Sequence, residues 1–402
     1  MRPFCAILLL FTAVLLSGCG GNSSVSVHPP AALTITPGTS TLLPRATQTF
    51  TASLKGAPVG VAWSIQEGTA GGEITAQGVY TAPYASGTYH LIATLLTNAT
   101  VQTNVPVVVR VGIVGNGRYV LQDLDTRIAG GVQAINNPGQ ILMEDAFWEN
   151  GNLTRLAALG PQARGINNKG QIVGADLVPG QFGREKSLAA FWPDKHAAPT
   201  YLATFGGENG FAVSINDVGQ FVGWASTFTS IDLDFSAAAL WQVGGGATQI
   251  GGGRATAINN KGEILLGNQL RQSNGTLISL AIVGTALNDL SQVVGYIPDS
   301  DGTPHGALWE GGKVTPLGTL GGSSSSPRGI NATGVIVGTS TLSNGTGHAF
   351  VYRSGQMLDL NTLVDSAPGW VLQDAVGINS SGQIVGHGSF QGSAHEFLLN
   401  PQ

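Results

Sequence analysis

Four polar segments of this chain combine aromatic side chains with charged ones, the mixture that sugar and peptide sites use. They span 178–186, 224–235, 296–303 and 364–371. Aromatic rings stack against a ligand, while carboxylates and guanidinium groups orient it by hydrogen bonds. The candidate ligand-binding residues are Phe182, Arg184, Trp224, Phe228, Asp232, Asp234, Phe235, Asp299, Asp301 and Trp370. The alternative, open at each position, is a solvated loop whose aromatic residues pack locally.

Metal and cofactor chemistry has weaker support in the sequence. Residues 299–302 (Asp-Ser-Asp-Gly) are similar to half of a calcium loop, but the glutamate that completes such a loop is missing, so an ordinary Asp-Gly turn is expected. His305, His348 and His395 occupy matching positions in three repeats, and each is expected to be buried and to bond a neighbouring backbone group. We therefore predict no metal and no cofactor.

Catalytic signatures are also missing from the sequence. It contains no Gly-x-Ser-x-Gly elbow, no His-Glu-x-x-His pair and no phosphate-binding loop. A carboxylate pair such as Asp232 and Asp299 could serve a glycosidase, but the sequence does not determine the distance between the two acids on which that chemistry depends. The chain is predicted not to be an enzyme, with a polysaccharide-active hydrolase or lyase as the alternative.

An internal repeat that fills residues 118–402 must position these loops. A hairpin signature of the form Ile-Asn-x-x-Gly-Gln, with variations, occurs seven times, and consecutive asparagines lie 29 to 49 residues apart. That period is typical of a four-stranded propeller blade. The repeated asparagines are Asn136, Asn167, Asn216, Asn259, Asn288, Asn331 and Asn379.

Each repeat is predicted to form four strands. The asparagine side chain can bond a backbone N–H two residues on, and the glycine supplies the positive φ that a short hairpin needs. A strand of the Gln-Ile-Val-Gly type follows, then a variable loop, an aromatic strand, a tight turn and a fourth strand. In the fourth repeat, residues 279–282 lack the aromatic residue, so the sequence does not decide whether this repeat has a third and a fourth strand. Four tryptophans are expected to lie buried between neighbouring units: Trp148, Trp192, Trp241 and Trp309.

The two ends of the repeat region complement each other. The last repeat stops after its third strand at 396–399, and residues 118–124 have the pattern of a separate fourth strand. Pairing these two segments would close a seven-bladed ring and cover both sheet edges. In such a ring the variable loops, between the second and third strands and between blades, emerge on one face, where we expect a ligand to bind.

The repeats also resemble the HAF extracellular repeat family of bacteria. The resemblance rests on His-Ala-Phe at 348–350 and Leu-Gly-Thr-Leu-Gly-Gly at 317–322, and it covers nearly all of 118–402. It implies a β-propeller-like fold and a place outside the cytoplasm. No common enzymatic activity goes with the family, so the resemblance supports location and fold more than function.

Residues 32–110 are predicted to form a separate small β-sandwich, because short alternating strands follow one another closely. Segments 71–75 and 78–83 resemble bacterial group 2 immunoglobulin-like domains. The resemblance implies an immunoglobulin-like sandwich that acts as a spacer. Trp63 lies where such sandwiches bury a tryptophan.

The first 18 residues have the pattern of a secretion signal. One charge precedes an apolar run at 6–16, which is too short to span a bilayer. The sequence Leu-Ser-Gly-Cys at 16–19 resembles the lipobox of bacterial lipoproteins. This implies cleavage after residue 18 and a lipid on Cys19 that anchors the chain in a bilayer, and Gly20 favours the outer membrane.

Composition limits the remaining possibilities. Residues 19–31 are small and polar and are expected to be a tether, with a linker at 111–117. The formal net charge is −5, and loss of Arg2 with the signal leaves 17 − 23 = −6. Charged residues make up only 10% of the chain and form no basic run, which argues against nucleic acid as a partner. Cys5 lies within the signal, so no disulfide is expected in the mature chain.

Together these patterns predict an all-β protein. The expected architecture is an immunoglobulin-like β-sandwich followed by a seven-bladed β-propeller closed by an N-terminal strand. The expected function is a non-catalytic, monomeric cell-envelope lipoprotein, a binding or scaffolding module that presents the propeller loop face to a glycan, peptide or protein ligand. A purely structural role is a third interpretation.

Overall fold

The computed structural model describes residues 32–42, 46–83, 87–109, 118–124, 130–158, 160–179, 185–230, 233–364 and 367–402, with backbone alone at 228–230 and 233–235. Its described residues are predominantly β-strand, with two short 3₁₀ turns, η1 (Gly68–Gly71) and η3 (Leu360–Thr362). The predicted all-β class is confirmed. None of the described helices is long and apolar enough to cross a membrane. The predicted signal, tether and linker lie outside the described residues.

The described residues of the N-terminal unit form three small sheets. The first has the order β1 (Leu33–Thr36), β4 (Thr51–Leu54), β5 (Ala57–Pro58). The second has the order β2 (Ser40–Leu42), β10 (Gln102–Val109), β9 (Gly87–Leu95), β6 (Val61–Ile65), with β2 and β10 parallel. The third has the order β3 (Thr47–Thr49), β8 (Val79–Thr81), β7 (Glu73–Ile74).

This unit has a hydrophobic core of its own. In β1 the alternating sequence Leu-Thr-Ile-Thr turns Leu33 and Ile35 inward and the threonines outward, as the two-residue period of a strand requires. Phe50 and Tyr80 are fully buried and meet edge to face, with ring centroids 6.2 Å apart. Trp63, expected in the core, is only partly buried and packs against the edge of this cluster.

Among the described residues, 118–402 contain seven four-stranded antiparallel sheets. In chain order, the first three are β12 (Val132–Ile135), β13 (Ile141–Met143), β14 (Ala146–Glu149), β15 (Asn152–Arg155); β16 (Pro161–Ile166), β17 (Ile172–Pro179), β18 (Glu185–Trp192), β19 (Thr200–Tyr201); and β20 (Gly210–Ile215), β21 (Gln220–Ser230), β22 (Leu233–Gln242), β23 (Thr248–Gly252). The next three are β24 (Ala257–Ile258), β25 (Ile264–Leu266), β26 (Gln269–Arg271), β27 (Leu277–Ser279); β28 (Val283–Leu287), β29 (Val293–Pro298), β30 (Pro304–Glu310), β31 (Lys313–Pro316); and β32 (Gly321–Ile330), β33 (Ile336–Leu342), β34 (Gly347–Arg353), β35 (Gln356–Asp359). The fourth repeat therefore does have third and fourth strands, β26 and β27, although both are short. Its third strand is Gln269–Arg271, so the comparison of residues 279–282 with the aromatic strands was wrong.

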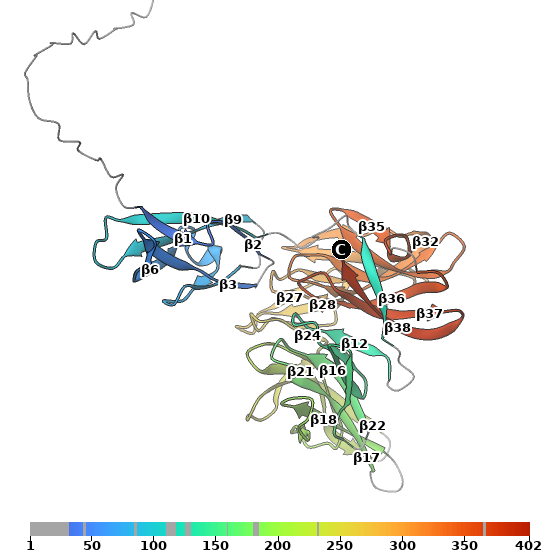
Figure 1. The fold of residues 1–402 in the computed structure, drawn as a ribbon. Coiled ribbons are helices and arrows are strands. Elements are labelled where there is room, and N and C mark those ends of the chain that lie inside the picture. The colour runs from blue at the N-terminus through green and yellow to red at the C-terminus, as the bar shows by residue number, and fades with distance from the viewer. Residues whose placement is uncertain are drawn as a thin grey trace, which may run out of the picture.

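The seventh sheet joins the two ends of the region. Its order is β36 (Trp370–Ile378), β37 (Ile384–Phe390), β38 (Ser393–Pro401), β11 (Tyr119–Asp123). The pairing of 118–124 with the last strand is confirmed, with Leu121 opposite Leu399. In Figure 1 the teal arrow of β11 lies beside the red strands of the C-terminus.

Hydrophobic side chains fill each interface between consecutive sheets. Trp192, for example, is fully buried in a cluster with Leu142 and Phe147 of the sheet before it. The last interface is filled in the same way, because Val385 and Leu398 of the seventh sheet pack with Ile141 of the first. The sheets therefore form a closed, propeller-like ring.

Three of the four tryptophans predicted to be buried are so: Trp192, Trp241 and Trp309 are exposed by 0%, 1% and 6%. The exception is Trp148, which is only partly buried. It lies in the first sheet, where β13 and β14 are short.

Candidate functional site

The asparagine of each repeat organises the turn between the first two strands of a sheet. Asn167 Oδ1 accepts backbone N–H bonds from Lys169 and Gln171, both at 3.0 Å. Gly170 closes the turn at φ +75°, where a side chain would be strained. The predicted turn chemistry is confirmed, and in the fifth repeat Ser291 adopts the same left-handed conformation at φ 63°.

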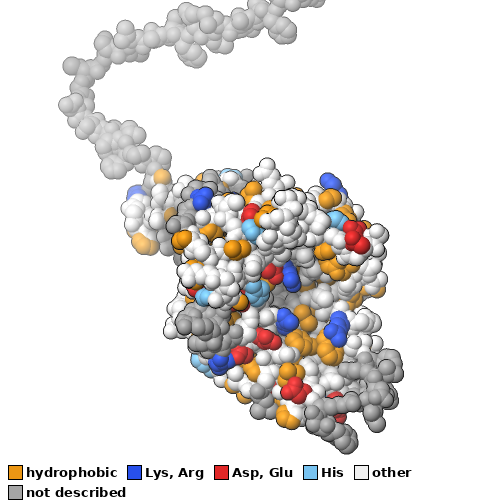
Figure 2. All heavy atoms as spheres, turned by 90° about the vertical axis from the view of Figure 1, so that its right-hand side faces the viewer, with side chains coloured by type: hydrophobic (Ala, Val, Ile, Leu, Met, Phe, Trp, Pro, Cys, Tyr) orange, Lys and Arg blue, Asp and Glu red, His pale blue; other side chains and the backbone are white. Residues whose placement is uncertain are grey.

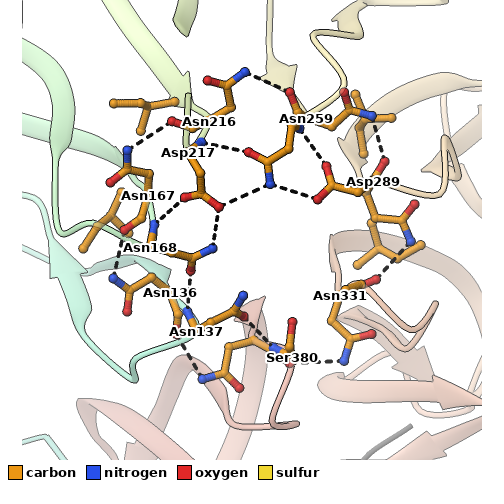
Figure 3. Close-up of a pocket in the computed structure, with 18 of the residues that line it drawn as sticks. Asn136, Asn137, Asn167, Asn168, Asn216, Asp217, Asn259, Asp289, Asn331 and Ser380 are labelled. Carbon is orange, nitrogen blue, oxygen red and sulfur yellow. Dashed lines mark hydrogen bonds between the residues drawn. The ribbon is translucent and has the colours of Figure 1, made fainter. Parts of the chain in front are cut away.

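The amide nitrogens of these asparagines also link the sheets to one another, which the sequence analysis did not predict. Each Nδ2 donates to the backbone oxygen of the corresponding asparagine in the next sheet (Figure 3). The seven bonds are Asn136 to Asn167 at 2.9 Å, Asn167 to Asn216 at 3.1 Å, Asn216 to Asn259 at 3.0 Å, Asn259 to Asn288 at 3.0 Å, Asn288 to Asn331 at 3.0 Å, Asn331 to Asn379 at 3.1 Å and Asn379 to Asn136 at 3.1 Å. We call this closed circle the asparagine ring.

The residues that follow the ring asparagines form a second, incomplete circle. The backbone N–H of Asn168, for example, donates to Asp217 Oδ1 at 2.8 Å. Asn260 Nδ2 donates to both Asp217 and Asp289, at 3.3 and 2.9 Å, so these carboxylates are partnered within the circle. Ala332 interrupts it, because alanine has no side-chain acceptor. Together the two circles line a depression of about 250 Å³, and their polar groups are largely used in holding the turns together.

A larger cavity, of about 830 Å³, lies at the other end of the innermost strands. It is lined by one residue from each of the seven sheets, always three positions before the ring asparagine. These residues are Gln133, Arg164, Val213, Thr256, Thr285, Arg328 and Val376, and we call them the cavity circle. Ser326, Asp374, Tyr296 and His387 also line the cavity.

A β-bulge turns the cavity circle inward. In six of the seven sheets the register between the first and second strands shifts at this position, as between Ala163 and Gly165 on either side of Arg164. A bulge leaves one extra residue outside the ladder and re-aims its side chain. In the fourth sheet Thr256 precedes β24, and its N–H donates to Leu265 O at 3.0 Å.

The charged groups of the cavity come mainly from three sheets. Arg328 Nη2 lies 3.2 Å from Asp374 Oδ2, and Thr339 donates a hydrogen bond to the same carboxylate. Arg164 donates to the side-chain oxygen of Gln133, a neutral group. The cavity thus places two guanidinium groups from different sheets around one opening.

His387 contributes a titratable group to the cavity wall. Its Nδ1 lies 2.5 Å from Oε2 of Glu396, whose side chain is only 13% exposed. The hydrogen bond with Glu396 raises the pKa of His387 above its ordinary value, although burial opposes the shift.

Figure 2 views the side on which the β17–β18 and β21–β22 hairpins end, and basic side chains gather there around a hollow, beside acidic and histidine side chains.

Two predicted ligand residues, Asp299 and Asp301, are engaged in a turn of their own. Asp299 Oδ1 accepts backbone N–H bonds from Asp301 and Thr303, at 3.1 and 3.0 Å. The side chains of Asp301 and His305 lower the pKa of Asp299 to about 2. This is the ordinary Asp-Gly turn that the sequence predicts, and no cluster of three or more potential metal ligands occurs among the described residues.

The two predicted tryptophans lie in different sheets. Trp224 occupies the position on β21 that Tyr296 and His387 occupy on their own strands, but it is not among the residues that line the cavity. The Arg254 guanidinium lies 4.6 Å from its ring centroid. Trp370 packs 5.6 Å from Phe390, outside the cavity lining.

The remaining candidates belong to two hairpins whose tips lie outside the described residues. Phe182, Arg184 and Asp232 lie outside the described residues, and the side chains of Phe228, Asp234 and Phe235 are also outside them. Only the backbone register is described, which pairs Phe228 with Phe235 across the β21–β22 hairpin.

The prediction for the three repeated histidines was wrong about both their burial and their bonding partner, because His305 is exposed and His348 and His395 are only partly buried. His305, His348 and His395 bond carboxylates rather than backbone: Asp299 at 3.1 Å, Asp359 at 2.7 Å and Asp123 at 3.1 Å. Each carboxylate comes from a neighbouring loop or outer strand, a contact that strand periodicity alone does not reveal.

Arg164, Arg328, Asp374 and His387 were all missed as candidates. The available signal was positional, since the first two lie three residues before a ring asparagine. Reading that column of the repeat would have shown charged residues in two of seven copies.

Comparison with known proteins adds little to this geometry. No protein-family model and no curated protein matches the chain. Among solved structures, a "putative TolB" from Agrobacterium tumefaciens is similar at 10% sequence identity and a TM-score of 0.37, over 70% of this chain and 97% of that one. The likeness is too low to carry an argument, so the two family resemblances remain predictions.

Proposed function

We propose that residues 118–402 form a seven-bladed β-propeller of the HAF type that binds a ligand at its variable-loop face without catalysis. The main support is the difference between the two ends of the ring. At the turn end, the side chain of each asparagine donates a hydrogen bond to the backbone oxygen of the asparagine in the next sheet. At the other end, charged side chains line an open cavity of about 830 Å³, a size that suits a small ligand or the tip of a larger one.

The experiment that tests this role is a binding screen with a blocked cavity. Purified protein is screened against glycans, peptidoglycan fragments and peptides, and each hit is measured again with Thr256→Trp and Thr276→Trp. Thr256 lines the cavity and is exposed, whereas Thr276 is an exposed turn residue outside its lining. We expect only Thr256→Trp to abolish binding. Binding that survives in both variants would place the ligand elsewhere.

The proposal includes a spacer role for residues 32–110 as an immunoglobulin-like sandwich. Its separate sheets and separate hydrophobic core support a unit that folds on its own account. A spacer would hold the propeller away from the membrane surface. Loss of this unit should therefore leave ligand affinity in solution unchanged.

The proposed anchor is a lipid on Cys19, with the chain at the outer membrane. Acyl chains stabilise membrane attachment by about 0.8 kcal/mol for each buried CH₂, so several chains hold nearly irreversibly. The wild type should sediment with membranes, and Cys19→Ala should be released into the soluble fraction. Equal sedimentation of both proteins would show that the anchor assignment is wrong.

A polysaccharide-active enzyme at the same cavity is the second candidate. One observation favours it: His387, whose pKa is raised, lines the same cavity as the carboxylate of Asp374, so an acid and a base could act on one ligand. The test is to incubate the protein with polysaccharides and measure new reducing or unsaturated ends. Activity that His387→Gln abolishes would replace the binding role with a catalytic one.

A further inference from the structure

The cavity circle is chemically asymmetric, with uncharged residues on one side and both of its arginines on the other. Val213, Thr256 and Thr285, from three consecutive sheets, are small and uncharged. The other part of the circle runs from Arg328 through Val376 and Gln133 to Arg164. Among the residues that line the cavity, the charged ones therefore lie on one side.

On that side, two of the three basic groups are paired with a carboxylate and the third is not. Arg328 is paired with Asp374 at 3.2 Å, and His387 with Glu396 at 2.5 Å. Arg164 differs, because its hydrogen bond goes to the neutral amide of Gln133, and no ion pair joins it to a carboxylate among the described residues. The cavity wall consequently has an excess of positive charge at Arg164, in a chain whose net charge is −5.

Arg164 is also held in place without being neutralised. Gln133 Nε2 donates to Gly131 O at 2.9 Å, which orients the amide oxygen toward the guanidinium. An arginine whose position is set by a neutral acceptor keeps its remaining N–H groups and its full charge for a ligand. The planar fork of arginine matches a carboxylate in a two-bond geometry, which a point charge such as lysine does not.

We propose that the cavity recognises a ligand bearing carboxylate groups and that Arg164 is the residue that binds them. This inference rests on the proposed binding function and specifies its ligand chemistry. Arg328 is the second arginine in the cavity wall, and it is already paired with Asp374. Asp374 is a positioning residue, since it acts through Arg328.

The test compares acidic probes with neutral probes of the same size. Calorimetry on the full-length protein measures the affinities for trigalacturonic acid and its methyl ester, and for triglutamate and triglutamine. We expect one acidic probe to bind at least about tenfold more tightly than its neutral match, because a charge-assisted hydrogen bond contributes about that factor or more. The pair that shows the difference identifies the source of the carboxylate, sugar acid or peptide.

Matched variants separate a local contact from overall charge. Arg164→Gln should weaken the acidic probe by about 10- to 100-fold and leave the neutral probe unchanged. Arg164→Lys should retain only part of the affinity. Lys313→Gln removes the same charge from an exposed position outside the cavity lining and should have little effect. Because Arg164 is exposed, its replacement should leave the melting temperature unchanged.

Several results would overturn the inference, and they differ in whether they also overturn the proposed binding function. If neutral and acidic probes bind equally, or Arg164→Gln binds as the wild type does, carboxylate recognition is wrong while the binding role stands. If none of the four probes binds and the broader screen also finds no ligand, both the inference and the proposed function are wrong. Hits in that screen without an acidic preference would overturn the inference alone.

Discussion

A single residue type, asparagine, performs two tasks at the centre of the ring. Its side-chain oxygen shapes the turn in which it lies, and its amide nitrogen binds the next sheet. Aspartate could perform the first task, since it has the same acceptor, but it lacks the donor that the second requires. At 3–5% exposure, these groups would lose more by standing unpaired than a surface amide would.

Asn167→Asp removes the amide donor. The variant keeps the acceptor for Lys169 and Gln171 but turns a carboxylate oxygen toward Asn216 O, which then keeps only the turn bond from Gly219 N–H, and the side-chain oxygen of Gln171 also loses its donor. We expect the free energy of unfolding to fall by about 1–3 kcal/mol at pH 7. Part of the loss should be recovered near pH 4, where a protonated carboxyl can donate.

Denaturant melts at both pH values measure this effect, with Asn152→Asp as control. Asn152 is exposed and bonds only within its own turn, at 3.3 Å from Asn150 O. An Asn167→Asp protein as stable as the control would mean that the asparagine ring contributes nothing measurable.

His387 makes stability depend on pH in a defined direction. The hydrogen bond with Glu396 raises its pKa in the folded protein, with Asp374 acting the same way and burial and Arg328 opposing. The folded state therefore binds the proton more tightly than the unfolded state does. The resulting stability is fully present below the unfolded pKa of about 6.5 and is lost as pH rises through the folded value.

Thermal melts of the wild type and His387→Gln across pH 5.5 to 8.5 test this linkage. The wild type should lose melting temperature relative to the variant as pH rises. Parallel curves for the two proteins would show that the ion pair is not coupled to folding.

At the scale of elements, a glycine in the second strand makes room for the bulged first strand in five of the seven sheets. The glycines of the Gln-Ile-Val-Gly type face a first-strand carbonyl that leaves no room for a side chain. A Cβ on Gly295 would lie 2.0 Å from Val283 O, and one on Gly223 would lie 1.9 Å from Phe211 O. The first and fourth sheets carry Met143 and Leu266 there, and their first strands, β12 and β24, are short, although the first sheet still bulges at Gln133.

Gly295→Ala should therefore destabilise the protein by about 2–3 kcal/mol or more, because both contacting groups are backbone and cannot move aside. Gly246→Ala is the matched control, since nothing lies within 4 Å of its added Cβ and its φ is not positive. The control should change stability by less than about 0.5 kcal/mol. Equal effects in denaturant melts would remove the steric explanation.

For the whole molecule, the ring is closed by a strand that begins more than 270 residues before its partner. The entropic cost of joining such distant segments grows only logarithmically with their separation. The gain is a full ladder from Tyr119 to Asp123 and the loss of an exposed sheet edge. Tyr119 is also buried, at 3% exposure, in a hydrophobic cluster shared by the sixth and seventh sheets.

Removal of residues 118–124 should lower the melting temperature and promote association through the uncovered edge of β38. Melts and size-exclusion chromatography measure the two effects. A shortened protein that melts like the wild type and stays monomeric would be incompatible with closure by β11.

A crosslink checks the register independently of stability. In a Cys19→Ala background, Val120→Cys with Asn400→Cys should form a disulfide, because these residues are directly opposite. Val120→Cys with Leu399→Cys should not, since neighbouring residues of a strand point to opposite faces. Crosslinking in the second pair alone would mean a register shifted by one residue.

The sequence by itself determined the all-β class, the number of repeats, the turn chemistry and the closing strand. These features depend on short-range preferences, such as Asn and Gly in a tight turn, or on a period that recurs along the chain. They did not require knowledge of which sheet lies next to which.

Only the tertiary structure decided where chemistry can gather. Asp299 and Asp301 were candidate ligand-binding residues because their loop combines carboxylates with an aromatic residue. In the structure, the carboxylate of Asp299 instead accepts backbone hydrogen bonds within its own turn. Arg164 and Gln133 are 31 residues apart and meet only because a bulge in each of two neighbouring sheets turns both side chains into one cavity. Hydrogen bonds and charges of this kind belong to the packing of the ring, and no local pattern of residues contains them.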